Sequence, residues 1–189
     1  MENNQLNEAE KKYLLNLARR TLEEYLTKRS VLQIDEAEVP LGLKVKQGVF
    51  VTLEKKGELR GCIGCLEPQK PIYQAVIENV INAAVNDWRF PEVSPSELKD
   101  ISIEISILSV PQLLKAKAEE RARVLRPLVD GVILEEGLNL ATYLPQVWEQ
   151  LADPQTFLCS LCEKGNWPKD AWQDEKIKLY IYQAEHFKE

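Results

Sequence analysis

The sequence predicts an α+β protein with mainly antiparallel sheet, and three observations support this. Apolar residues recur at helical spacing in residues 7–28 and 71–87. In the stretch ISIEISIL, Ile101–Leu108, isoleucines alternate with polar residues from Ile101 to Ile107, which predicts a strand with one buried face. Residues 48–64 and 130–144 each hold two apolar runs joined by a glycine-containing turn, the pattern of β-hairpins. Hairpins combined with packed helices indicate the α+β class.

The first helix is expected over residues 7–28. Asn7 is a suitable N-cap, and Glu8 and Glu10 suit the positive end of the helix dipole. Residues 30–43 have mixed polarity and contain a proline, so we expect a connecting loop there.

A hairpin and a second helix follow. Gly57 can adopt the positive φ that a tight turn at residues 55–57 requires. Pro71 fits the first position of a helix that continues to Asp87. Residues 89–100 are broken by prolines and predict a loop with at most one helical turn.

The remaining elements follow from the same signals. Asp153 is the expected N-cap of a helix that has Pro154 at its first position and Gly165 at its end. Gly137 is placed in the turn of the second hairpin. The other expected elements are a short helix over 111–125, a helical segment over 145–151 and one closing strand over 176–187.

Composition narrows the class of protein. The chain has 189 residues, 44% of them hydrophobic, and suits one domain or two small lobes with a shared core. No apolar run approaches the roughly 20 residues that span a bilayer, and the N-terminus lacks the pattern of a secretory signal. We therefore expect a soluble, cytoplasmic protein without membrane contact. The net charge of −6 argues against non-specific binding to nucleic acid.

The 4 cysteines form two pairs with metal-like spacing, Cys62-x-x-Cys65 and Cys159-x-x-Cys162. The gap between the pairs is far longer than in compact zinc modules, and the second pair lies in an apolar helical segment where cysteine acts as a small hydrophobe. A strand through Cys62 and Cys65 would point the two thiols to opposite faces, which disfavours a redox pair. We expect neither a metal site nor a cofactor. The only histidine, His186, lies near the chain end, so a histidine-dependent nucleophile is not expected.

One group of polar residues, near the end of the first hairpin, is a candidate functional site. Gly61 and Gly64 permit close backbone approach, and Arg60 is a donor for anions on the same stretch. Asp87 and Arg89 follow where the second helix ends. A thiol at Cys62 beside two guanidinium groups could have a lowered pKa and act as a nucleophile. The alternative is an Arg60–Asp87 or Arg89–Asp87 ion pair that only braces the loop, and the sequence leaves both open.

The chain resembles the AMMECR-one family, the AMME chromosomal-region proteins, whose prokaryotic members are called AmmeMemoRadiSam system protein A. The matching stretches follow the family's order and cover nearly the whole chain. They are GVFVTL (Gly48–Leu53), LRGCIG (Leu59–Gly64), AAVNDWRFP (Ala83–Pro91), ISIEISIL (Ile101–Leu108), DGVIL (Asp130–Leu134), TYLPQV (Thr142–Val147) and FLCSLCEKG (Phe157–Gly165).

The resemblance implies a single domain of this type over residues 1–189, built of two packed α+β lobes, each an antiparallel sheet with flanking helices. It does not supply the boundary between the lobes. It further implies an intracellular component of a modification pathway shared with a Memo-like protein and a radical-SAM protein. The family does not have a settled activity, and its eukaryotic members have been linked to regulation and nucleic-acid metabolism.

The chain matches the family pattern in the LRGCIG core and in the D-x-R-F-P segment. Cys65 departs from this pattern, because the family usually has a small hydroxyl residue at that position. The leading hypothesis is a site at these motifs that binds a partner or an anionic small molecule. An enzyme with Cys62 as nucleophile and Asp87 as orienter is one alternative, and a nucleic-acid-associated regulator is another. The residues that match the pattern are Arg60, Gly61, Cys62, Gly64, Asp87, Arg89 and Phe90.

Overall fold

The computed structural model describes residues 6–189, and the chain divides into two compact units. The first unit runs to Leu108 and also includes Glu185–Glu189, while the second is Ser109–Ala184. Each unit holds one four-stranded sheet. The expected α+β class is confirmed.

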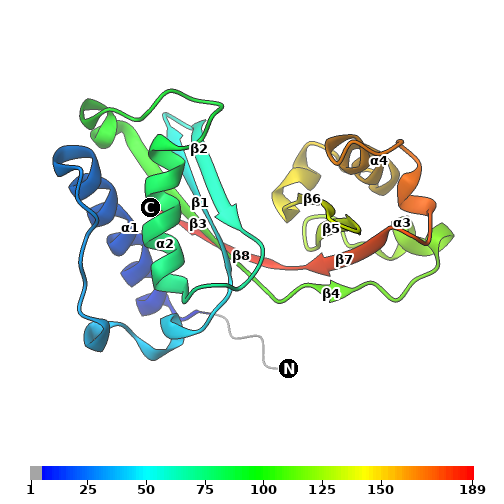
Figure 1. Cartoon of the computed structure of the whole chain (residues 1–189), viewed down its shortest axis with the longest axis horizontal. Helices are drawn as coiled ribbons and strands as arrows, with labels where there is room; N and C mark the ends of the chain where they lie inside the picture. The colour runs from blue at the N-terminus through cyan, green and yellow to red at the C-terminus, as the bar shows by residue number, and fades with distance from the viewer. Residues whose placement is uncertain (1–5) are drawn as a thin grey trace. The chain divides into compact units, whose positions relative to one another are not determined.

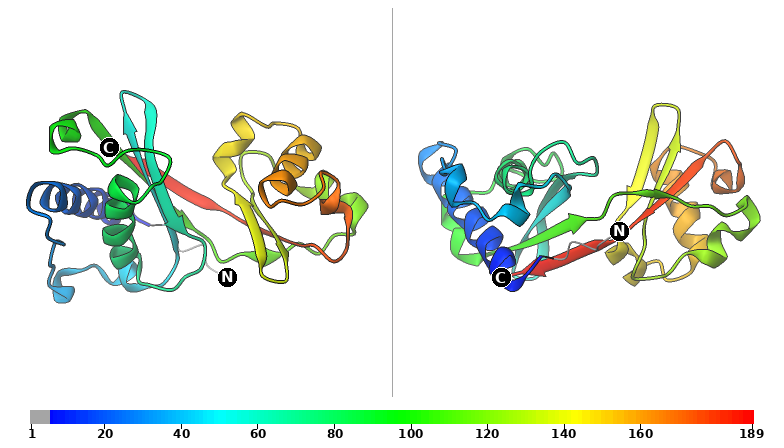
Figure 2. Two further views of the ribbon diagram at one scale, coloured as in Figure 1. Left: turned by 45° about the horizontal axis from the view of Figure 1, so that its top comes forward. Right: turned by 90° about the horizontal axis from the view of Figure 1, so that it is seen from below.

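The sheet of the first unit has the strand order β2-β1-β3-β8, so β2 lies at one edge. Strand β1 pairs antiparallel with both β2 and β3. The helices α1 and α2 cover one face of this sheet, as Figures 1 and 2 show. The elements are α1 (Glu8–Lys28), β1 (Gly48–Lys55), β2 (Glu58–Cys65), α2 (Ile72–Val85), β3 (Ile101–Leu108) and β8 (Ala184–Lys188).

The register across this sheet separates two sets of side chains. Thr52 of β1 lies opposite Cys62 of β2 and Glu104 of β3, so these three share one face. Their neighbours Val51 and Ile105 are fully buried on the other face, which packs against the helices. The helix-free face therefore carries a thiol, a hydroxyl and a carboxylate in one row.

Several expected local signals are confirmed. Asn7 and Glu10 form a capping box at the start of α1, with both reciprocal bonds at 3.0 Å. Gly57 has φ +82° in the β1–β2 turn. Asp153 caps α4 (Pro154–Lys164) by accepting a hydrogen bond from the Thr156 N–H at 2.8 Å.

The sheet of the second unit has the strand order β4-β7-β5-β6. Its core holds α4 side chains against the sheet, with the ring of Trp148 stacked on Phe157 at 3.8 Å between centroids. Figure 2 shows the β5–β6 hairpin in yellow. The elements are β4 (Gln112–Leu113), α3 (Arg121–Val124), β5 (Gly131–Glu136), β6 (Asn139–Tyr143), α4 (Pro154–Lys164) and β7 (Lys178–Tyr182).

Some expected elements were wrong. The short helix over 111–125 is instead the strand β4 followed by a 3-10 turn and α3, because Gln112–Leu113 pairs with β7. The closing strand over 176–187 is two strands, β7 and β8, which belong to different sheets. Pro71 is the N-cap of α2 and not its first residue.

Smaller helical turns complete the chain. The expected loop over 30–43 contains two 3-10 helices, and residues 145–151 contain a 3-10 helix where a helical segment was expected. The short 3-10 segments are η1 (Glu36–Glu38), η2 (Leu41–Lys44), η3 (Pro95–Asp100), η4 (Ala118–Glu120), η5 (Pro145–Glu149) and η6 (Ala171–Gln173). Within residues 6–189, no helix combines the length and apolar character needed to cross a bilayer.

Gly61 sets how closely α2 approaches β2. A Cβ atom at this position would lie 2.1 Å from the carbonyl oxygen of Ala83, a backbone atom that cannot move without shifting the helix. Gly61→Ala should therefore lower the free energy of unfolding by about 2–3 kcal/mol. Urea denaturation followed by far-UV circular dichroism measures this. Gly57→Ala, at a turn with open space around it, should cost about 1 kcal/mol. Equal losses for the two variants would contradict the close approach.

Candidate functional site

The centre of the site is the backbone of Cys62 on the edge strand β2. Its N–H donates to Asp87 Oδ2 at 2.8 Å, and its carbonyl oxygen accepts from Arg89 Nη2 at 3.2 Å. Asp87 and Arg89 thus take the place that a neighbouring strand would occupy beside β2. An edge strand with unpaired N–H and C=O groups is a template for unwanted pairing, and this side-chain clamp blocks it.

The clamp is closed by a two-point ion pair. Arg89 donates from Nε to Asp87 Oδ1 at 2.9 Å and from Nη2 to Oδ2 at 2.7 Å. The Asp87 side chain is only 2% exposed. The Arg89 guanidinium, followed by the Cys62 N–H, stabilises the ionised form and lowers the pKa of Asp87 to about 2. Of the two ion pairs considered from sequence, the structure forms Arg89–Asp87.

Arg60 belongs to a separate cluster. Its Nε donates to Glu97 Oε1 at 3.1 Å, and its Nη1 donates to the Pro91 carbonyl at 2.8 Å. Lys55 adds a second cation on Glu97, at 2.9 Å. Arg60 first, together with the Ser94 N–H and Lys55, lowers the pKa of Glu97 well below its usual range. Arg60 therefore fastens the Pro91–Glu97 segment to β2 and does not face the Cys62 thiol.

The Cys62 thiol is not activated by this arrangement. Burial raises its pKa, and the nearby Asp87 and Glu104 carboxylates act in the same direction. The Thr52 hydroxyl donates to the sulfur at 3.3 Å and, with Arg89, opposes the rise without reversing it. Asp87 contacts the backbone of Cys62, so the structure does not place it as an orienter of the sulfur. The nucleophile hypothesis stays a prediction.

The two glycines of the motif serve packing. Gly61 admits the Ala83 carbonyl, and a Cβ on Gly64 would lie 2.3 Å from the Phe50 ring. Cys65 lies on the helix side of β2, beside Ala75 and Asn79, which line the same pocket. Cys62 and Cys65 thus point to opposite faces, as the strand period predicts.

The sequence reasoning missed three residues of this region. Glu97 could have been found as the last residue of the capping box that begins at Ser94. Thr52 follows only from the strand register. Trp88 stands within the D-x-R-F motif and is 91% exposed, although tryptophan is usually buried.

The cysteines supply no metal centre among residues 6–189, where no group of three or more His, Cys, Asp or Glu side chains could hold an ion. All four are free thiols, and the two pairs belong to different units. Cys162 is fully buried in the core of the second unit, and burial raises its pKa to about 11.

Together, the fold and the clamped motif define an α+β protein whose LRGCIG strand is bound by a D-x-R-F loop. The model of the AMMECR1 family matches residues 15–187. The chain belongs to the AMMECR1 family, the one that its motifs resemble.

Similar proteins come from archaea. A protein of Methanothermobacter thermautotrophicus is 41% identical over 186 residues, covering 97% of this chain and 96% of its own length. A protein of Thermococcus onnurineus is 42% identical over 183 residues, covering 94% of this chain and 89% of its own. The crystal structure of the uncharacterized protein PH0010 from Pyrococcus horikoshii matches with a TM-score of 0.91 and 37% identity, over 97% of this chain and 93% of that one.

Asp87 should make the free energy of unfolding depend on pH. Its folded pKa lies below its unfolded value, so its contribution is complete above the unfolded pKa and is lost as pH falls through the folded pKa near 2. Asp87→Asn should lower the free energy of unfolding by about 2 kcal/mol at pH 6, and this difference should shrink between about pH 5 and pH 2. Urea titrations at several pH values measure it, with Asp100→Asn as the control. A difference that does not change with pH would contradict the clamp.

The Cys62 thiol should react slowly. In a Cys65→Ser background, peptide mass spectrometry should show iodoacetamide labelling of native Cys62 at pH 7.5 at least about tenfold slower than labelling of unfolded protein, because the folded pKa is raised. Because the pKa is raised, the rate should still be rising with pH at the free-cysteine pKa of about 8.5, where an unperturbed thiol begins to level off. A plateau reached below pH 7 would instead establish an activated nucleophile.

Proposed function

We propose that this protein is a partner-binding component of an AmmeMemoRadiSam-type modification pathway, and that it docks through the loop that clamps β2. The observation that carries the proposal is Trp88, an almost fully exposed tryptophan between the two residues of the clamp. Exposed tryptophan and arginine are the residue types that dominate binding energy at protein interfaces.

The loop is held in place before any partner arrives. Asp87 and Arg89 bind the Cys62 backbone. Within the loop, the Phe90 N–H donates to the Asp87 carbonyl at 3.0 Å. The Val93 N–H donates to the Ala84 carbonyl at 2.8 Å, which ties the loop to α2. A loop fixed in this way loses little conformational entropy on binding. Trp88 is therefore presented on a rigid support.

The charges also favour a protein partner over a small anion. The Arg60 guanidinium is occupied by Glu97 and by backbone carbonyls, with its side chain only 12% exposed. Arg89 is 42% exposed, and its Nη1 makes no hydrogen bond within residues 6–189. One partly free guanidinium beside an exposed indole suits an interface with an apolar patch flanked by a carboxylate.

Trp88→Ala should weaken binding of the Memo-like or the radical-SAM protein from the same organism at least about 30-fold, the scale of an interface hot spot. Biolayer interferometry with purified proteins measures the dissociation constants. Leu138→Ala is the matched control, because Leu138 is a fully exposed apolar residue in the other unit. Binding that is unaffected by Trp88→Ala, or equally weakened by Leu138→Ala, would reject this loop as the docking surface.

A further inference from the structure

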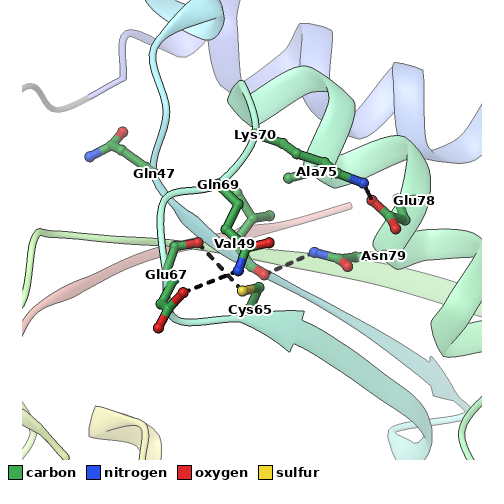
Figure 3. A pocket seen from close by; sticks show the side chains of 9 residues that line it. All are labelled: Gln47, Val49, Cys65, Glu67, Gln69, Lys70, Ala75, Glu78 and Asn79. Atoms are coloured by element: carbon green, nitrogen blue, oxygen red, sulfur yellow. Dashed lines mark hydrogen bonds and ion pairs between the residues drawn. The ribbon is translucent and has the colours of Figure 1, made fainter.

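A pocket of about 110 Å³ lies at the other end of β2, within the first unit. It is lined by the start of β1, the end of β2, the segment that follows β2, and one face of α2 (Figure 3). The proposed docking loop does not contribute to its lining.

Asn79 supplies an amide acceptor to this pocket. The residue is 7% exposed, and its Nδ2 donates to the Val49 carbonyl at 3.0 Å. That bond fixes the orientation of the amide, because a carbonyl oxygen can only accept. The amide oxygen Oδ1 then has no donor among residues 6–189. This oxygen is open to a donor from solvent or from a ligand, and the amide oxygen Oε1 of Gln47, which also lines the pocket, is buried without a partner in the part of the chain that the structure describes.

The charged groups around the pocket are also rich in acceptors. Glu67 and Glu78 supply carboxylates, and Lys70 supplies one ammonium, which leaves one negative charge in excess. The Glu67 carboxylate accepts one hydrogen bond, from Gln69 Nε2 at 3.1 Å. Lys70 is paired with Glu78 near the rim, where both side chains are half-exposed. Figure 3 shows both pairs beside the pocket.

We propose that this pocket binds a small cationic hydrogen-bond donor, a guanidinium or alkylammonium group. Such a group can donate to Asn79 Oδ1 while its charge is balanced by Glu67. The volume also fits, because a water molecule takes about 30 Å³ in the liquid, so the pocket has room for about four non-hydrogen atoms. The ion pair of Lys70 with Glu78 is an intramolecular example of the same recognition.

This inference goes beyond the proposed function, because it requires no protein partner. The cation can come from a free amine or guanidine compound, or from an arginine or lysine side chain of a bound protein. Both sources present the same headgroup to the same acceptors.

The test is a titration of the full-length protein with methylguanidinium chloride, followed by ¹H–¹⁵N NMR at constant ionic strength. The backbone amides of Cys65–Lys70 and the side-chain amide of Asn79 should shift and saturate. Urea, a neutral planar molecule that resembles the guanidinium headgroup, should produce no saturable shift. Absence of saturation with methylguanidinium, or an equal response to urea, would overturn the proposal.

Three variants make the test specific. Glu67→Gln should weaken binding about tenfold, since a charge-assisted bond becomes a neutral one. Lys70→Gln should strengthen it, because the competing ammonium is removed from Glu78. Glu36→Gln, an exposed carboxylate on another segment, is the control and should bind as the wild type does. If Glu67→Gln leaves the affinity for methylguanidinium unchanged, or if Lys70→Gln weakens it, the result would count against the pocket.

A final arm separates the two sources. N-acetyl-arginine N-methylamide carries the same guanidinium on a peptide backbone, and binding equal to that of methylguanidinium would support a protein side chain as the occupant. Binding of methylguanidinium alone would support a free small molecule. The titration is repeated with Trp88→Ala, which should not change it, so failure of the docking proposal and failure of the pocket proposal are distinguishable.

Discussion

The first unit depends on the hydrogen bond from the Cys62 N–H to the Asp87 carboxylate. Asp87 lies just beyond the end of α2, so this bond ties the helix to the exposed edge of the sheet. It forms only because Gly61 lets α2 approach β2 closely. Arg89 keeps the carboxylate ionised and also binds the Cys62 carbonyl, so both backbone groups of the edge residue are satisfied.

This constraint changes how the motif is understood. Gly61 and Gly64 allow close packing, and Arg60 fastens a loop to β2. The Cys62 thiol accepts a hydrogen bond from the Thr52 hydroxyl, and burial raises the pKa of this thiol. Most residues of the motif therefore have structural roles, and together they hold the loop at residues 87–90 in place. What this loop presents to solvent is the side chain of Trp88 and part of Arg89. This exposed pair is the reason that we propose binding and not covalent catalysis.

Local sequence signals were sufficient for much of the fold. The capping residues Asn7 and Asp153 and the alternating strand Ile101–Leu108 each carry their own signal, independent of distant contacts. Residues 111–125 could not be read in this way, because the strand at Gln112 exists only through pairing with β7, far along the chain. Likewise no turn residue marks the change of sheet after Tyr182, so one strand was expected where there are two.

The sequence was sufficient to predict which residues belong to the site, but not which of them contact one another. Proximity of Cys62, Asp87 and Arg89 was expected, but a strand pattern does not reveal that a side chain will bind the backbone of the edge strand. The partner of Arg60 is Glu97, which belongs to a capping box that can be read from sequence, although the contact between them cannot.

The same two elements, β2 and α2, support both surfaces of the first unit. Near Cys62 the end of α2 leads into the clamp and Trp88, while near Cys65 the middle of α2 contributes Asn79 and Glu78 to the polar pocket. The two features differ in charge, since the loop exposes a guanidinium and the pocket has an excess carboxylate. Strand and helix are joined by the close contact of Gly61 with Ala83, next to the clamp, so each surface rests on packing between β2 and α2 that the other also requires. A sequence that preserves the motif for its fold would therefore preserve the support of both surfaces at once.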